Sequence, residues 1–105
     1  DPDNKILKDK TGDEPVEPID FKLFQNYPNP FNPDTKITYM IKEYTDVKLI
    51  IYDLLGREIT KLVNQKQHPG TYSIPFSPLN LASGIYLYKL ISGNISDSKK
   101  MVYMR

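Results

Sequence analysis

Apolar and polar side chains alternate in short runs along most of this chain, and a period of two residues is typical of β-strands. Ile37, Tyr39 and Ile41 share one face of such a run, which indicates a strand with one buried side. The pattern predicts strands at Phe21–Phe24, Lys36–Lys42, Val47–Asp53, Glu58–Val63, Gly70–Phe76, Ile85–Ile91 and Ile95–Met104. Further core positions are expected at Val47, Leu49, Ile51, Tyr72, Ile74, Phe76, Tyr86, Tyr88 and Leu90.

Turn-forming residues separate these runs. Glycines in Leu54–Arg57 and in Ser92–Asn94 predict tight turns. Polar or proline-bearing stretches predict connections at Glu43–Asp46, Asn64–Pro69 and Ser77–Ser83, the last anchored in the core by Leu81.

Two departures from strict alternation predict local features of the strands. Leu62 and Val63 are adjacent apolar residues, which indicates a β-bulge. Pro75 has no N–H to donate to a neighbouring strand, so its strand is expected at the edge of a sheet.

No stretch carries a sustained 3.6-residue apolar stripe, so the fold class is predicted to be all-β. Short strands separated by turn signals are typical of a sandwich or a small barrel. We favour a two-sheet sandwich of about seven antiparallel strands with Greek-key connections.

The chain of 105 residues has room for one modest domain. Residues 1–20 are charged, proline-bearing and aperiodic, and we expect a linker or the tail of a preceding domain, with a weak short strand at Lys5–Lys8. The start resembles no signal peptide, so the sequence is interpreted as a piece of a longer exported protein.

Three prolines at nearly alternate positions mark the segment that follows the first predicted strand, Tyr27-Pro28-Asn29-Pro30-Phe31-Asn32-Pro33. Each proline removes a backbone donor and restricts the residue before it to extended geometry. A rigid segment outside the regular strand ladder is predicted.

Charge and cysteine content exclude several classes of function. Lys and Arg number 14 against 13 Asp and Glu, a balance that gives no field to attract nucleic acid. With no cysteine there is neither a disulfide nor a thiolate metal site. No apolar run approaches the roughly 20 residues of a membrane span.

Candidate chemistry is sparse, and we expect no catalytic residue, no cofactor and no metal. His68 lies alone in a polar stretch, whereas a zinc site needs several clustered ligands. Asp53 is interpreted as a turn cap paired with Arg57, and Ser83 lacks a base to activate it.

Tyrosine is abundant, with eight residues and no tryptophan. An aromatic platform for sugars or single strands is one interpretation of the set. Core packing with hydroxyl groups at the rim is the stronger interpretation. The set comprises Tyr39, Tyr52, Tyr72, Tyr86, Tyr88 and Tyr103.

The stretch from Phe21 to Tyr39, with its proline segment, resembles the opening of the type A C-terminal sorting domain of the type IX secretion system. Later motifs follow in the family's order and extend the resemblance over residues 21–105, although Ile41-Lys42 and Phe76–Asn80 depart from the usual pattern. The residues that carry it are Tyr27, Pro28, Asn29, Pro30, Phe31, Asn32, Pro33, Gly56, Arg57, Gly70, Tyr72, Ser83, Gly84, Tyr86, Lys99 and Lys100.

The resemblance implies an immunoglobulin-like β-sandwich that directs a covalently attached N-terminal cargo through the periplasm to secretion or to the cell surface. It implies two partners, the outer-membrane translocon and a sortase-like peptidase that cuts upstream of Phe21. We expect a monomer. Our hypothesis is that the translocon recognises the rigid proline segment and the last strand, the strand through strand addition. The last strand would present Lys99, Lys100 and Arg105. The alternative is a non-catalytic carbohydrate-binding or structural module.

Overall fold

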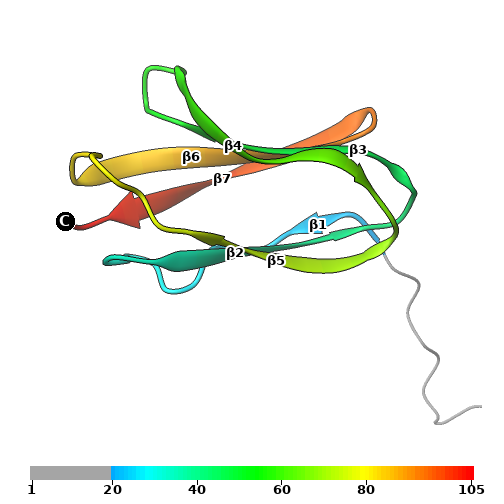
Figure 1. The fold of residues 1–105 in the computed structure, drawn as a ribbon, viewed down its shortest axis with the longest axis horizontal. Coiled ribbons are helices and arrows are strands. Elements are labelled where there is room, and N and C mark those ends of the chain that lie inside the picture. Colours follow the sequence, from blue (N-terminus) through cyan, green and yellow to red (C-terminus); the bar gives the residue numbers. More distant parts are fainter. Residues whose placement is uncertain (1–19) are drawn as a thin grey trace, which may run out of the picture.

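A computed structural model describes residues 20–105 as two antiparallel β-sheets that face each other (Figure 1). The predicted linker, except for Asp20, and the short strand expected at Lys5–Lys8 lie outside the described residues. The strands are β1 (Lys22–Leu23), β2 (Thr35–Ile41), β3 (Thr45–Tyr52), β4 (Glu58–Gln67), β5 (Gly70–Phe76), β6 (Gly84–Ser92) and β7 (Ile95–Tyr103).

One sheet has the strand order β1-β2-β5 and the other β4-β3-β6-β7. Strand β2 pairs with β5 while β3 pairs with β6 in the opposite sheet, so the chain crosses between the sheets in Greek-key fashion. The predicted all-β sandwich is confirmed, and its strands are arranged as in immunoglobulin-like folds.

The core lies between the sheets and is built from the alternating positions that the sequence indicates. Ile37, Tyr39 and Ile41 of β2 are fully buried, as are Val47, Leu49 and Ile51 of β3. Tyr86, Tyr88 and Leu90 of β6 are also buried, and so is Phe76, whereas Tyr72 and Ile74 are half-buried. Core packing is therefore confirmed for most of the predicted set.

Two strands extend into stretches that were predicted as connections. Strand β3 begins at Thr45, inside the expected connection, and β4 continues to Gln67, inside the expected Asn64–Pro69 loop. The loop prediction was wrong because polarity there reflects an exposed sheet edge. Gln67 itself is buried, and its Oε1 accepts a hydrogen bond of 2.6 Å from the Tyr39 hydroxyl.

Strand β4 contains two bulges rather than one. Leu49 pairs with Val63 and Ile50 with Lys61, so Leu62 has no partner on β3. Likewise Ile51 pairs with Thr60 and Tyr52 with Glu58, which leaves Ile59 unpaired. The predicted bulge at Leu62 is confirmed, and the one at Ile59 has no sign in the apolar pattern.

Pro75 lies on an edge strand, as predicted, since β5 borders only β2. The backbone groups of Lys36 bond to Tyr27, on the side of β2 away from β5. Pro75 is the partner of Lys36, so its backbone nitrogen also faces away from the other strand of the pair. A missing N–H on that side costs the β2–β5 ladder nothing.

Two tyrosine hydroxyls are satisfied inside the sandwich. The Tyr88 hydroxyl donates to the Phe24 carbonyl at 2.7 Å and accepts from the Asn26 N–H at 2.8 Å. Tyr39 donates to Gln67. Burial raises the pKa of both Tyr39 and Tyr88 to about 12, because the phenolate would lose its hydration.

The domain is expected to lose stability in strong alkali. Both tyrosines ionise near pH 10 when unfolded but near pH 12 when folded, so the unfolded state releases protons first. The free energy of unfolding should be level below pH 10 and fall from pH 10 to 12. Urea titrations at pH 9 and 11.5 measure this, and Tyr88→Phe should flatten the fall. Equal unfolding free energies at the two pH values would contradict it.

Candidate functional site

The two ends of the sandwich carry different features (Figure 1). The described chain begins at one end, where Asp20 Oδ1 lies 4.0 Å from Lys42 Nζ beside the β2–β3 turn. It finishes at the other end, where the red terminus lies near the yellow β5–β6 loop and the green β3–β4 turn. We name this second end, with the segment Tyr27–Pro33, the C-terminal end.

Phe31 fixes the proline segment to the core at the C-terminal end. Its side chain is 1% exposed, with ring centroids 5.1 Å from Tyr103 and 6.2 Å from Phe76. The segment's three prolines follow cis peptide bonds. The other motif residues of the segment, from Tyr27 to Pro33, are exposed. Phe31 is thus the one residue of the segment whose side chain packs in the core.

Backbone and amide groups join this segment to the last strand. The Phe31 N–H donates to the Val102 carbonyl and the Met104 N–H donates to the Phe31 carbonyl, both at 3.0 Å. The Val102 N–H donates to Asn29 Oδ1 at 2.8 Å. The segment therefore lies along the free edge of β7 in parallel orientation.

A buried polar cluster holds the start of the segment in place. Asn26 is 2% exposed, and its Nδ2 donates to the Thr35 hydroxyl and to the Pro28 carbonyl. Its Oδ1 accepts from Gln25, whose same amide also donates to the Lys100 carbonyl at 2.7 Å. The cluster therefore links β2, the segment and β7.

The hypothesis of strand addition at the end of β7 does not fit this arrangement. Four outward backbone groups there, the Lys100 carbonyl, both groups of Val102 and the Met104 N–H, already bond to Gln25, Asn29 and Phe31. A partner strand would have to displace the buried Phe31 ring to reach them. Covering an edge in this way is how many sheets avoid unwanted pairing.

The Ser83-Gly84 motif also meets the last strand. The Arg105 N–H donates to Ser83 Oγ at 2.8 Å, and Gly84 pairs with Tyr103. The Tyr86 hydroxyl donates to the Ala82 carbonyl at 2.7 Å, which holds the end of the β5–β6 loop against β6. Three sequence-distant motifs therefore converge at the C-terminal end.

Gly84→Val is expected to lower the thermal unfolding midpoint. Gly84 has φ +156°, which β-branched residues avoid, although a side chain there would meet open space. Strain at such a position costs of order 1–3 kcal/mol. Calorimetry should show the loss, whereas Ala82→Val, on an exposed neighbour, should not. An unchanged midpoint for Gly84→Val would contradict the prediction.

The Gly56-Arg57 motif forms the β3–β4 turn, as the sequence predicts. Gly56 has φ +85°, and Asp53 Oδ1 accepts the backbone N–H groups of Leu55 and Arg57. The Arg57 guanidinium contacts Asp53 Oδ2 at 2.7 Å. The Arg57 backbone N–H, and then its side chain, hold the pKa of the Asp53 carboxyl below its ordinary value. The predicted turn cap is confirmed.

Two of the remaining motif residues lie away from the C-terminal end. Gly70 and Tyr72 lie toward the opposite end, where the Tyr72 ring stacks on Tyr39 at 5.4 Å and its hydroxyl bonds the His68 carbonyl. Lys99 is half-buried and Lys100 is exposed on β7.

Side chains that commonly bind metals do not cluster in the described part. Residues 20–105 hold no group of three His, Asp or Glu side chains placed to bind a metal. His68 is exposed and its ring lies 4.6 Å from the Tyr44 ring, at the end opposite the proline segment. No helical segment in the described range has the length and apolarity to cross a bilayer.

Sequence reasoning missed the polar cluster of Gln25, Asn26 and Thr35. A Gln-Asn pair before a proline segment reads as an ordinary exposed loop. Its partners Tyr88 and Lys100 lie 62 and 75 residues away, so no local pattern could have found them.

These features define a class: a non-helical, immunoglobulin-like sandwich whose proline segment closes the edge of its last strand. The family model of secretion-system C-terminal sorting domains matches residues 25–104. The chain therefore belongs to this family, the sorting signals that direct larger proteins through type IX secretion to the cell surface or beyond.

A solved structure shares the fold. The crystal structure of dimeric latent PorU from Porphyromonas gingivalis aligns with a TM-score of 0.63 and 19% identity over 85% of this chain. The match spans 10% of that protein's chain. Comparison with curated proteins finds no match.

Proposed function

We propose that residues 21–105 form a self-contained sorting domain that the type IX outer-membrane translocon recognises in its folded state, in the periplasm. Residues 1–20 would then be the linker to a cargo domain on the N-terminal side. The observation that supports this proposal is that the two ends of the domain differ. The described chain enters at one end, and the proline segment, Ser83-Gly84 and β7 converge at the other. An attached cargo leaves that second end accessible.

A reporter fusion tests this proposal. A periplasm-directed fluorescent protein carrying residues 1–105 at its C-terminus is expected at the cell surface or in the medium of a type IX-competent bacterium. The same fusion should stay in the periplasm of an isogenic strain without the translocon. Periplasmic retention in the competent strain, or equal release in both, would refute the proposal.

We further propose that the domain, as a monomer, is the substrate of a sortase-like peptidase and has no catalytic activity of its own. The polar groups at the C-terminal end support this, because Asn26, Thr35 and Asn29 are engaged in holding the fold. Mass spectrometry of the delivered reporter should find its new C-terminus before Phe21. A cut within residues 21–105 would contradict this part.

The carbohydrate-binding alternative has little support. Four tyrosines of the predicted set have buried rings, among them Tyr39, Tyr86 and Tyr88, so the set offers no exposed platform. The two strongly exposed tyrosines, Tyr27 and Tyr44, lie at opposite ends of the sandwich.

A further inference from the structure

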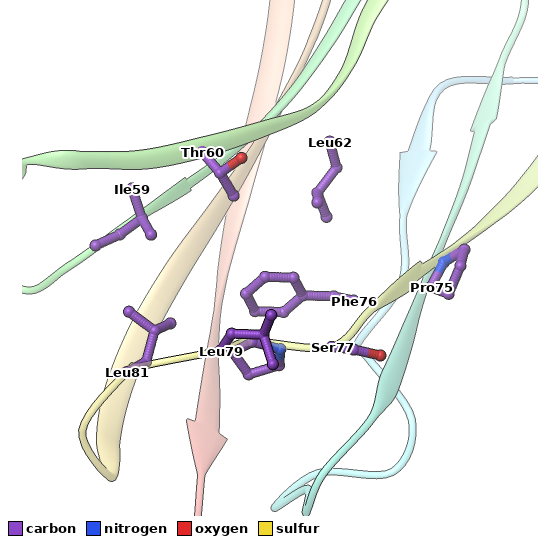
Figure 2. A pocket seen from close by; sticks show the side chains of 9 residues that line it. Ile59, Thr60, Leu62, Pro75, Phe76, Ser77, Leu79 and Leu81 are labelled. Carbon is purple, nitrogen blue, oxygen red and sulfur yellow. The ribbon is translucent and has the colours of Figure 1, made fainter.

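An apolar groove opens at the C-terminal end, between β4 and the β5–β6 loop (Figure 2). Its volume is about 320 Å³. The Phe76 ring lies at its centre, Ile59 and Leu62 come from β4 on one side, and Leu79 and Leu81 come from the loop on the other. Leu79 is 82% exposed.

Irregular backbone places the side chains on both walls. Ile59 and Leu62 are the two residues of β4 without a partner on β3, so both apolar wall residues from β4 sit at bulges. Bulges re-aim side chains and are common near functional sites. On the loop, Asn80 has φ +64°, a conformation that costs free energy in a non-glycine residue, and it lies between Leu79 and Leu81.

Exposed apolar residues gather at the same end. Tyr44 follows β2 and Ile95 begins β7, at the opposite end, whereas the other exposed large apolar side chains of the described part belong to segments at or near the C-terminal end (Figure 1). They are Tyr27, Leu54, Leu55, Ile59, Leu79, Ile85 and Met104. Two of them, Ile59 and Leu79, line the groove.

The flanking strands show which kind of partner fits. Both β4 and β5 are sheet edges, but bulges disrupt the ladder of β4 and Pro75 interrupts that of β5. A partner strand would therefore pair poorly with either. The groove offers only two side-chain hydroxyls, from Thr60 and Ser77, too few to bind a sugar by its hydroxyl groups.

We propose that this groove is a docking site for an apolar side chain that a folded protein of the secretion machinery inserts, with Leu79 as the principal contact residue. The site lies at the end away from the described start of the chain, so an N-terminal cargo leaves it open. This inference rests on the proposed function and adds the surface through which the domain is recognised.

The test compares two leucines of similar exposure. Leu79→Asp, in the reporter fusion with residues 1–105, is expected to lower surface delivery about tenfold, since losing one anchor residue commonly weakens association by that factor or more. Leu55→Asp is the matched control, because Leu55 is 77% exposed at the same end but does not line the groove. It should be delivered like the unmodified fusion.

Three outcomes would overturn the proposal: normal delivery of Leu79→Asp, equal losses for both variants, or glycan binding by the purified chain that Leu79→Asp abolishes. The thermal unfolding midpoint of each variant is measured in parallel. If Leu79→Asp unfolds the domain, Leu79→Ala removes the same side chain without adding a charge, and its delivery decides the question. If the unmodified fusion is not delivered, the proposed function itself fails; delivery of that fusion together with Leu79→Asp refutes the groove alone.

Discussion

Phe31→Ala is expected to lower the free energy of unfolding by about 3–5 kcal/mol, the usual loss for a buried phenylalanine. The ring is 1% exposed and contacts Tyr103 and Phe76, so its removal leaves a cavity between the sheets. The loss should move the thermal unfolding midpoint down by more than about 12 °C. Urea titration and calorimetry measure both quantities.

The effect should extend beyond the cavity. Without the ring, the contact of the segment with β7 depends on its backbone and amide bonds to Val102 and Met104, which are exposed to competition from water. Amide hydrogen exchange is therefore expected to quicken at Val102 and Met104. Surface delivery of a fused reporter should fall in proportion to the unfolded fraction.

Tyr27→Ala is the matched control for this substitution, because Tyr27 belongs to the same segment but is 82% exposed. Substitution there should change the free energy of unfolding by less than about 0.5 kcal/mol. If the two variants had similar stability, the idea that Phe31 anchors the segment would be wrong.

The strands of this fold could be predicted because a half-buried strand imposes a period of two on the chain. Ile37, Tyr39 and Ile41 show this most clearly, and all three are fully buried. The limits of β4 could not be predicted, since Asn64–Lys66 lie at an exposed edge and carry no apolar signal. Polarity distinguishes buried from exposed residues, not strands from loops.

The site was only partly predictable, for a different reason. The motif residues were named from a family resemblance, but nothing local indicates that Phe31 meets Tyr103 or that Arg105 meets Ser83. The groove depends on which residues of β4 lack a partner, which is a property of register between strands. Contacts between distant segments follow from topology, and the order of strands could not be deduced from the chain.

Because the proline segment covers the end of the β7 edge, some motif residues have a structural role. A motif residue can matter for delivery because the machinery contacts it or because the folded domain needs it. Phe31 and Tyr86 are of the second kind, since both are buried. The exposed groove residues, which belong to no motif named from the sequence, are candidates for the first.

Deletion of Lys99–Arg105 is expected to abolish surface delivery and leave the parent protein in the periplasm. The deletion removes Met101 and Tyr103 from the core and strips Phe31 of its backbone partners on β7. Each lost core side chain costs about 2–5 kcal/mol, so the total reaches the whole stability of a typical domain. Circular dichroism should show loss of the β-sheet signal. Normal surface delivery of the truncated protein would contradict the prediction.

A double substitution distinguishes the effect of unfolding from the effect of losing the two lysine charges. Lys99→Ser with Lys100→Ser keeps the core residues Met101 and Tyr103, so the thermal unfolding midpoint should stay close to that of the unmodified domain. Because the main-chain carbonyl of Lys100, not its ammonium group, bonds Gln25, the closure of the edge should also persist. Delivery is therefore expected to remain near normal, which would assign the loss in the deletion to unfolding. Failed delivery of this folded double variant would instead show that the secretion machinery reads the two lysines themselves.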